Sequence, residues 1–244
     1  MSEFEFYENL KDWNFDSINY TSESLTNWEL YDELNKVITF DSVVLDLGTG
    51  GGEKVLKNFP KCKQIIATDY SPEMIKTANE NLKKSGRNDV VFKVMDNLKM
   101  DTQNDYFDIV VARHTCTDAT QIYKTLKKGG KLLIRGVDKL DCWALKMIFG
   151  KGTGFDNEKP ISLIDYENIT KANFKNIELI PIHVREYYKS KEDLIKLLIK
   201  VPILNEFMKD AKLDLNLLDK YIAENTTEKG ILLFRRYYGI VAEK

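Results

Sequence analysis

Short apolar runs alternate with amphipathic segments through the first two thirds of the chain. Each run is apolar at most positions, which is typical of strands buried between two layers of helices. The runs occupy residues 42–47, 64–68, 90–94, 107–111 and 131–134. Strands that alternate with helices are joined by right-handed crossovers and lie parallel. The pattern therefore predicts an α/β fold built on a parallel sheet.

Two of the intervening segments carry clear helix boundaries. Ser71 is an N-cap candidate, followed by Pro72 at the first helical position and an acid near the positive end of the helix. This helix is expected to run to Lys84 and to end near Gly86. A second amphipathic helix is expected over residues 118–127, ending before Gly129.

The last third of the chain has a different pattern. An extended stretch covers residues 177–187, and a final strand is expected over 231–241. Residues 191–208 are apolar at helical spacing, and Pro202 is expected to divide them into two helices. A further helix is predicted over 215–224.

Composition restricts the class of protein. The 244 residues include 36 basic and 38 acidic side chains, a net charge of -2, which argues against a large nucleic-acid-binding face. Three widely spaced cysteines and two histidines predict neither a metal site nor a disulfide framework, and they suit a reducing cytosol. The N-terminal residues do not resemble a signal peptide, and no run approaches the ~20 apolar residues of a membrane span. We therefore expect a cytoplasmic protein without a membrane segment.

The strongest motif is a glycine-rich loop directly after the first apolar run. Residues 46–53 read Asp-Leu-Gly-Thr-Gly-Gly-Gly-Glu, and Asp69 follows 23 positions after Asp46. Glycines permit a sharp turn and a close approach of ligand to backbone, and an acid at this spacing can accept hydrogen bonds from ribose hydroxyls. The dinucleotide motif requires a third glycine where Glu53 stands, so the loop disfavours a nicotinamide cofactor.

These residues resemble the class I S-adenosylmethionine (SAM)-dependent methyltransferases. The first motif of that family resembles residues 46–52, its second-strand acid resembles Asp69, and its acid after the third strand resembles Asp96. A "LkpGG" turn is similar to residues 126–130, with Lys128 in place of the usual proline. The similarity covers residues 40–136.

The resemblance implies a Rossmann-like, doubly wound, seven-stranded sheet, mostly parallel with an antiparallel last strand, plus an N-terminal extension and a late helical insertion. It implies one domain over residues 1–244, with an extension or lid at 1–35, a SAM-binding core at 36–140 and substrate-side helices at 141–244. The cofactor would be SAM. The residues expected to bind it are Asp46, Gly48, Thr49, Gly50, Gly52, Asp69, Tyr70, Met74, Asp96, Asn97 and Arg113.

The loop after the fourth strand faces the reaction centre in this family, and here it begins at Arg113 and His114. It lacks the motif of enzymes that methylate exocyclic base amines. His114 is the candidate catalytic residue, because imidazole can deprotonate a hydroxyl or amine acceptor near neutral pH. A hydrogen-bonded histidine that only shapes the pocket is the alternative. Cys116 is expected to be a packed residue rather than a nucleophile.

Aromatic residues gather before the first strand and around residue 187. Such side chains make apolar walls for a small molecule, although packing on the core explains most of them equally well. The candidate substrate-binding residues are Tyr7, Trp13, Tyr20 and Tyr187. The leading hypothesis is methyl transfer to O or N of a small molecule. An RNA methyltransferase and a non-catalytic SAM-binding protein are the alternatives.

Overall fold

The computed structural model describes residues 17–244, which form two compact units. The sheet unit contains residues 28–136, 162–180 and 238–244, and the helical unit contains 17–27, 137–161 and 181–237. The chain passes between the units several times, so the division does not by itself establish separate domains. The single domain over residues 1–244 and its three segments therefore stay a prediction.

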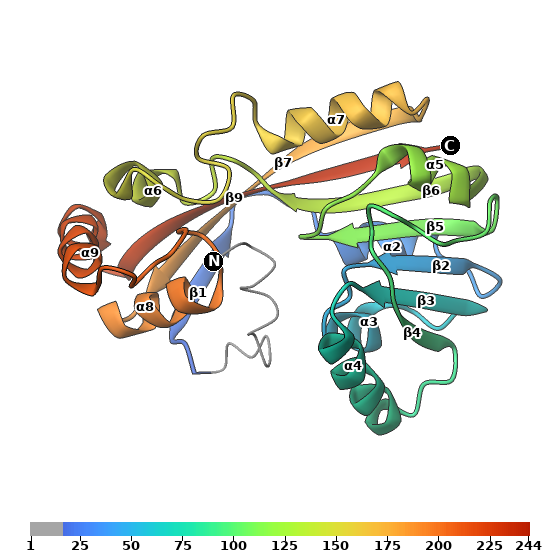
Figure 1. The fold of residues 1–244 in the computed structure, drawn as a ribbon, viewed down its shortest axis with the longest axis horizontal. Helices are drawn as coiled ribbons and strands as arrows, with labels where there is room; N and C mark the ends of the chain where they lie inside the picture. The colour runs from blue at the N-terminus through green and yellow to red at the C-terminus, as the bar shows by residue number, and fades with distance from the viewer. Residues whose placement is uncertain (1–16) are drawn as a thin grey trace. The chain divides into compact units, whose positions relative to one another are not determined.

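The five apolar runs all form strands of the sheet unit, as predicted (Figure 1). They are β2 (Val43–Leu47), β3 (Gln64–Asp69), β4 (Val90–Val94), β5 (Phe107–Arg113) and β6 (Leu126–Val137). Every pair that neighbours β2, β3 or β5 is parallel, and all five residues of β2 are buried. Parallel strands covered on both faces need apolar residues at consecutive positions, which explains the sequence pattern.

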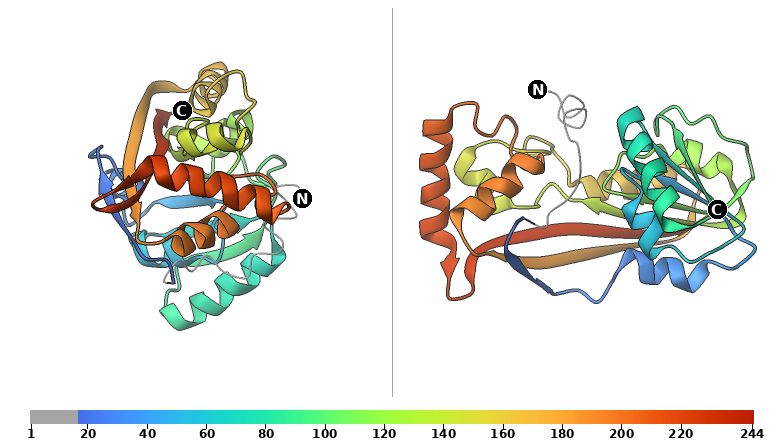
Figure 2. Two further views of the ribbon diagram at one scale, coloured as in Figure 1. Left: turned by 90° about the vertical axis from the view of Figure 1, so that its left-hand side faces the viewer. Right: turned by 90° about the horizontal axis from the view of Figure 1, so that it is seen from below.

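Two long strands complete the sheet, β7 (Lys175–Tyr188) and β9 (Gly230–Glu243), and Figure 2 shows them side by side. The order is β4-β3-β2-β5-β6-β9-β7. The backbones of Lys244 and of the Gly129–Gly130 turn exchange hydrogen bonds, so β9 runs antiparallel to β6. The predicted mixed, Rossmann-like sheet is therefore confirmed. Two unpredicted strands are added, β1 (Tyr20–Ser24) against β7 and β8 (Thr226–Thr227) against β9.

Helices connect the strands of the sheet unit. They are α2 (Leu30–Val37), α3 (Glu53–Asn58), α4 (Pro72–Ser85), α5 (Ala119–Thr125) and α7 (Ile161–Lys171). The predicted boundaries of α4 are confirmed, because Ser71 Oγ accepts a hydrogen bond from the N–H of Met74 and Gly86 ends the helix with φ of 68°. The α5 helix ends earlier than predicted, since Leu126 already pairs with Phe107 in the sheet.

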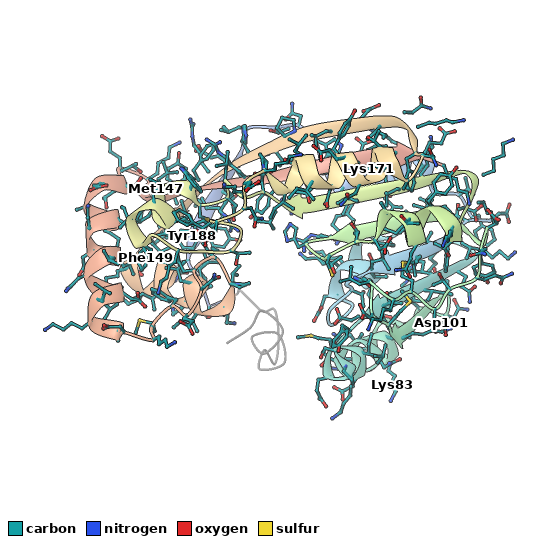
Figure 3. All side chains as sticks on the ribbon, turned by 45° about the horizontal axis from the view of Figure 1, so that its top comes forward. Lys83, Asp101, Met147, Phe149, Lys171 and Tyr188 are labelled. Carbon is teal, nitrogen blue, oxygen red and sulfur yellow. The ribbon has the colours of Figure 1, made fainter. Side chains whose placement is uncertain are left out.

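The helical unit contains α6 (Trp143–Phe149), α8 (Lys191–Lys200) and α9 (Ala211–Asn225). Their apolar faces share one buried cluster, in which Figure 3 labels Phe149 and Tyr188. The prediction of a second helix within residues 191–208 is wrong. Pro202 supplies no backbone N–H, and Glu206 and Met208 have φ of 52° and 70°, so the chain turns until Asp210 caps α9. No helix within residues 17–244 is both long and apolar enough to cross a membrane.

A buried ion network crosses the helical unit. Arg235 donates two hydrogen bonds of 3.0 Å to Asp141 and one of 3.1 Å to Glu186. The hydroxyl of Tyr188 donates to the same Glu186 oxygen at 2.7 Å. Because an unpaired buried charge is costly, these partners fix how β7, β9 and the start of α6 pack together.

Candidate functional site

The glycine-rich loop leaves the carboxyl end of β2 and leads directly into α3. Gly48, Gly50 and Gly52 all have positive φ, at 72°, 58° and 77°. A Cβ on Gly48 would lie 2.6 Å from the Cβ of Thr115, and one on Gly52 would lie 2.5 Å from Cζ of Phe92. Both the backbone conformation and the packing therefore require glycine at positions 48 and 52.

Asp69 holds this loop against the end of β3. One carboxylate oxygen accepts the N–H of Gly50 at 2.8 Å, and the other accepts the N–H of Ser71 at 3.0 Å. The N–H of Thr49 donates to the carbonyl of Thr68 at 2.8 Å. A carboxylate has about four acceptor positions, so Asp69 keeps capacity for further donors such as two ribose hydroxyls.

Asp46 is 5 % exposed at the end of β2. Burial raises the pKa of its carboxyl to about 7, nearby Thr49 and Arg113 oppose that rise, and Asp69 adds to it. Removing a carboxylate from water disfavours its charged form, which accounts for the direction of the shift. At neutral pH the group is poised between its two protonation states.

Asn97 and Thr49 contribute buried polar atoms to the same end of the sheet. Asn97 is buried, and its amide nitrogen donates to Thr115 Oγ1 at 2.9 Å. Within residues 17–244, Asn97 Oδ1 and Thr49 Oγ1 make no well-formed hydrogen bond. Buried polar atoms of this kind are normally satisfied, so a polar ligand beside the loop would complete them.

The remaining predicted cofactor residues lie around the same strand ends. Tyr70 directly follows Asp69 and is 54 % exposed, whereas Met74 is buried in the first turn of α4. Asp96 follows β4, where one of its carboxylate oxygens accepts the N–H of Leu98 at 2.8 Å. Arg113 ends β5 and is half-buried. The fold therefore gathers the predicted cofactor residues at the carboxyl ends of β2 to β5 and in the first turn of α4; their roles stay predictions.

His114, the predicted catalytic residue, follows β5 with φ of 52°. Its backbone N–H donates to the carbonyl of Arg135 at 2.8 Å, and its Nε2 lies 3.2 Å from a guanidinium nitrogen of Arg135. A guanidinium can only donate, so this contact requires Nε2 to accept and the imidazole to be neutral. His114 can take up a proton at Nε2 only when Arg135 moves away from that atom.

A cavity of about 40 Å³ borders the glycine loop. Its lining includes Asp46, Thr49 and Arg113, which were predicted, together with Tyr31 and Lys54, which were not. The position of Lys54, immediately after the acid that ends the glycine motif, is the signal that could have identified it. Tyr31 lies on α2, a helix that no distinct sequence pattern marks.

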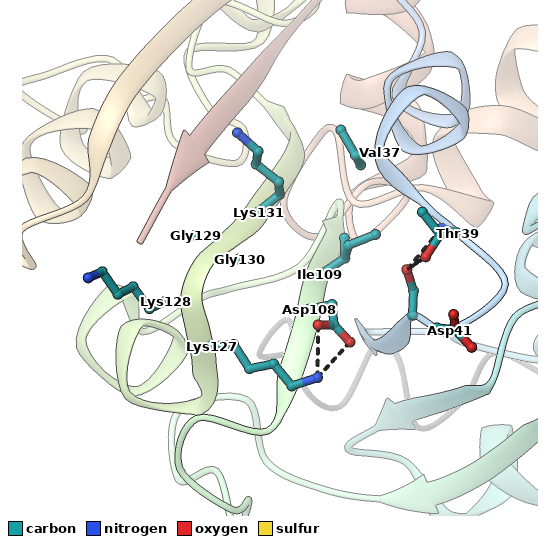
Figure 4. Close-up of a pocket in the computed structure, with 11 residues that line it drawn as sticks. Val37, Thr39, Asp41, Asp108, Ile109, Lys127, Lys128, Gly129, Gly130 and Lys131 are labelled. Atoms are coloured by element: carbon teal, nitrogen blue, oxygen red, sulfur yellow. Dashed lines mark hydrogen bonds and ion pairs between the residues drawn. The ribbon is translucent and has the colours of Figure 1, made fainter.

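A second cavity, of about 450 Å³, lies at the opposite, amino ends of β2 and β5 (Figure 4). There Lys127 forms an ion pair with Asp108 at 2.8 Å, and Asp108 also accepts the N–H of Val43 at 2.8 Å. Ligands of open α/β sheets bind outside the carboxyl ends of the strands. The smaller cavity is therefore the candidate active site, in spite of its size.

Two of the four predicted substrate residues, Tyr20 and Tyr187, lie within the described part of the chain. Tyr20 and Tyr187 both belong to the helical unit. The ring of Tyr20 stacks on Tyr188, with centroids 5.3 Å apart, and the hydroxyl of Tyr187 donates to Glu23 at 3.2 Å. Tyr7 and Trp13 lie outside the described residues. A role for these four in substrate binding stays a prediction.

Comparison with known proteins finds a family match that includes the glycine loop and strands β2 to β6. A family model described as "Methyltransferase domain" matches residues 38–146. A ribosomal protein L11 methyltransferase from Alkaliphilus oremlandii is 30 % identical over 117 residues, which are 45 % of this chain and 37 % of that protein. The match thus spans about a third of the length of that relative.

Solved structures share the fold at low sequence identity. A Bacillus halodurans protein assigned as a methyltransferase has a TM-score of 0.63 at 19 % identity, over 88 % of this chain and 98 % of that one. The phosphoethanolamine N-methyltransferase 2 of Haemonchus contortus, solved with SAM, has a TM-score of 0.52 at 20 % identity. The match covers 89 % of this chain and 52 % of that one. Residues 38–146 therefore match the model of the methyltransferase domain, and the chain shares its fold with these solved structures.

Proposed function

We propose that this chain transfers the methyl group of SAM to an oxygen or nitrogen atom of a small molecule. The observation that carries the proposal is the loop at positions 48–52, held by the hydrogen bond from Gly50 to Asp69. The loop leaves no room for side chains at Gly48 and Gly52, and it presents the buried hydroxyl of Thr49. A cradle without side chains beside an acid suits a ligand with a ribose.

SAM supplies an electrophilic methyl on a good leaving group, so the protein needs to position the acceptor and, for some acceptors, remove a proton. In the proposed site, Asp69 accepts hydrogen bonds from the ribose hydroxyls while retaining its contacts to Gly50 and Ser71. Asp46 and Arg113, which both line the small cavity, would hold the amino-acid end of the cofactor. His114 receives the acceptor's proton once Arg135 has released its Nε2.

The charge of the chain supports a small-molecule acceptor over RNA. Its 36 basic residues are balanced by 38 acidic ones, whereas RNA-binding proteins commonly carry an excess of positive charge. The L11 methyltransferase relative acts on a ribosomal protein, and the residues shared with it, under half of this chain, leave the acceptor open. Incubation with isotopically labelled SAM and separate small-molecule, RNA and protein fractions of a cell extract would identify the acceptor class. Label in the RNA or protein fraction alone would overturn the small-molecule proposal.

Calorimetry with four ligands tests cofactor choice. SAM and S-adenosylhomocysteine are expected to bind, and NAD and FAD are not, because Glu53 replaces the glycine that lets helix and strand approach a pyrophosphate. Binding of NAD without binding of SAM would overturn the proposal. Binding of SAM with no methylated product in any fraction would favour the non-catalytic alternative.

A further inference from the structure

We infer that Lys54 and Arg113 form a receptor for an oxyanionic group, a carboxylate or a phosphate, of a ligand bound at the glycine loop. The inference rests on the proposed function, because it concerns a ligand of the same site. Lys54 lies in the first turn of α3 and Arg113 ends β5, and both line the 40 Å³ cavity. Neither residue belongs to the glycine motif itself.

The two cations are not neutralised by the protein. In the part of the chain that the structure describes, neither Lys54 Nζ nor the Arg113 guanidinium makes a hydrogen bond or an ion pair, although both side chains line the cavity. Arg113 is half-buried, and a partly buried cation without a partner is unfavourable.

Like charges also crowd the cavity. Burial and the positive charges of Arg113, Lys57 and Arg135 lower the pKa of Lys54, while Glu53 alone opposes them. Asp46, the acid on the cavity wall, has a pKa raised to about 7 and so carries only part of a charge at neutral pH. An anion placed between Lys54 and Arg113 would relieve this repulsion.

The size and donors of the cavity define the ligand group. A volume of about 40 Å³ holds a few atoms rather than a whole metabolite. The buried Thr49 hydroxyl lines the same space and makes no well-formed hydrogen bond within residues 17–244. Two cations and one hydroxyl around so small a space match the several acceptor positions of a carboxylate or phosphate.

The oxyanion has two possible sources, the amino-acid end of the cofactor or a second ligand, and ligand truncation separates them. S-adenosylhomocysteine carries the carboxylate, whereas 5′-methylthioadenosine has the same nucleoside and sulfur without it. We would measure both by calorimetry in the wild type, Lys54→Met and Arg113→Met. Lys57→Met is the control, because Lys57 lies in α3 but outside the cavity. Inorganic phosphate would then be titrated into the protein saturated with S-adenosylhomocysteine.

If the cofactor supplies the group, Lys54→Met and Arg113→Met weaken S-adenosylhomocysteine about tenfold or more and leave 5′-methylthioadenosine unchanged. If a second ligand supplies it, S-adenosylhomocysteine binding is unchanged, and the wild-type complex binds phosphate while both variants lose it. Equal weakening of both nucleosides, or no change in nucleoside and phosphate binding, would overturn the inference. Failure of the wild type to bind either nucleoside would instead overturn the proposed function. Lys54 is exposed, so its replacement should leave the fold intact, and thermal unfolding would check this.

Discussion

The carboxylate of Asp69 accepts the backbone N–H of Gly50 at a distance of 2.8 Å, across 19 positions of the sequence. Asp69 therefore shapes the glycine loop, and in the proposed function it would also accept hydrogen bonds from a ribose. A residue with both roles should affect ligand affinity more than a single lost hydrogen bond would suggest.

Replacement of Asp69 by alanine is expected to weaken S-adenosylhomocysteine by about tenfold to a hundredfold, because hydrogen bonds to a charged acceptor contribute about 1.5–3 kcal/mol. Calorimetry measures the loss, and Asp101→Ala, on an exposed loop, is the matched control. Wild-type affinity in a folded Asp69→Ala protein would show that the acid is misassigned.

Gly52→Ala is expected to destabilise the protein through backbone strain and through a steric clash. Gly86→Ala introduces only the strain, so comparing the two variants separates the effects. Both glycines have left-handed backbones, with φ of 77° and 68°, so each substitution carries about 1–2 kcal/mol of backbone strain. Only at Gly52 does the new Cβ meet a neighbour, Phe92, and overpacking adds about 1–3 kcal/mol. Urea denaturation of both variants measures the difference; equal free energies of unfolding would contradict the predicted clash.

Asp46 should make stability depend on pH. Its pKa is raised by burial to about 7, so between about pH 4 and pH 7 the folded protein keeps a proton that the unfolded chain releases. The free energy of unfolding therefore falls as pH rises through that window, by up to about 4 kcal/mol, and levels off above it. Asp46→Asn carries no such proton, and its stability relative to the wild type should increase from about pH 4.5 to about pH 8. Urea denaturation of both proteins at the two pH values measures their free energies of unfolding. The same difference between the two proteins at both pH values would contradict the raised pKa of Asp46.

The His114→Ala variant tests whether His114 acts as a general base. If His114 is a general base, turnover is expected to fall by ~10²–10⁴-fold with nearly unchanged affinity for SAM. If His114 only supports the pocket through its contact with Arg135, affinity should fall and turnover at saturation should persist. Calorimetry comes first, because it needs no acceptor, and a product assay follows once the acceptor is known. His183→Ala, in the helical unit, is the control. If neither the affinity for SAM nor the turnover of His114→Ala changes, His114 has no role in the mechanism.

Arg235→Met is expected to destabilise the protein by about 3–5 kcal/mol, since it leaves Asp141 and Glu186 buried without a counter-charge. Arg185→Met, at an exposed position of β7, should change the free energy of unfolding by less than about 0.5 kcal/mol. Urea denaturation at neutral pH compares the two. A loss at Arg235 no larger than that at Arg185 would mean that the network contributes little.

The sequence alone determined the parallel strands of the sheet and the position of the glycine loop. Continuous apolar runs identify strands buried on both faces, and the positions of Ser71 and Gly86 set the ends of α4, because capping depends on local backbone geometry. The spacing from Asp46 to Asp69 likewise predicts an acid at the end of the next strand, where the structure places it.

Only the tertiary structure decided which residues that are distant in the sequence contact one another. Tyr31 reaches the cavity because α2 packs beside the loop, and no distinct sequence pattern marks that helix. Lys54 follows the glycine motif directly, but its sequence position alone does not show that its side chain lines the cavity. The pairing of His114 with Arg135 joins residues 21 positions apart, on strand ends whose register the sheet sets. The buried partners of Arg235 lie 49 and 94 positions away. Contacts over such separations depend on strand order and burial, whereas the periodicity of a sequence reports only which face of its own element a residue occupies.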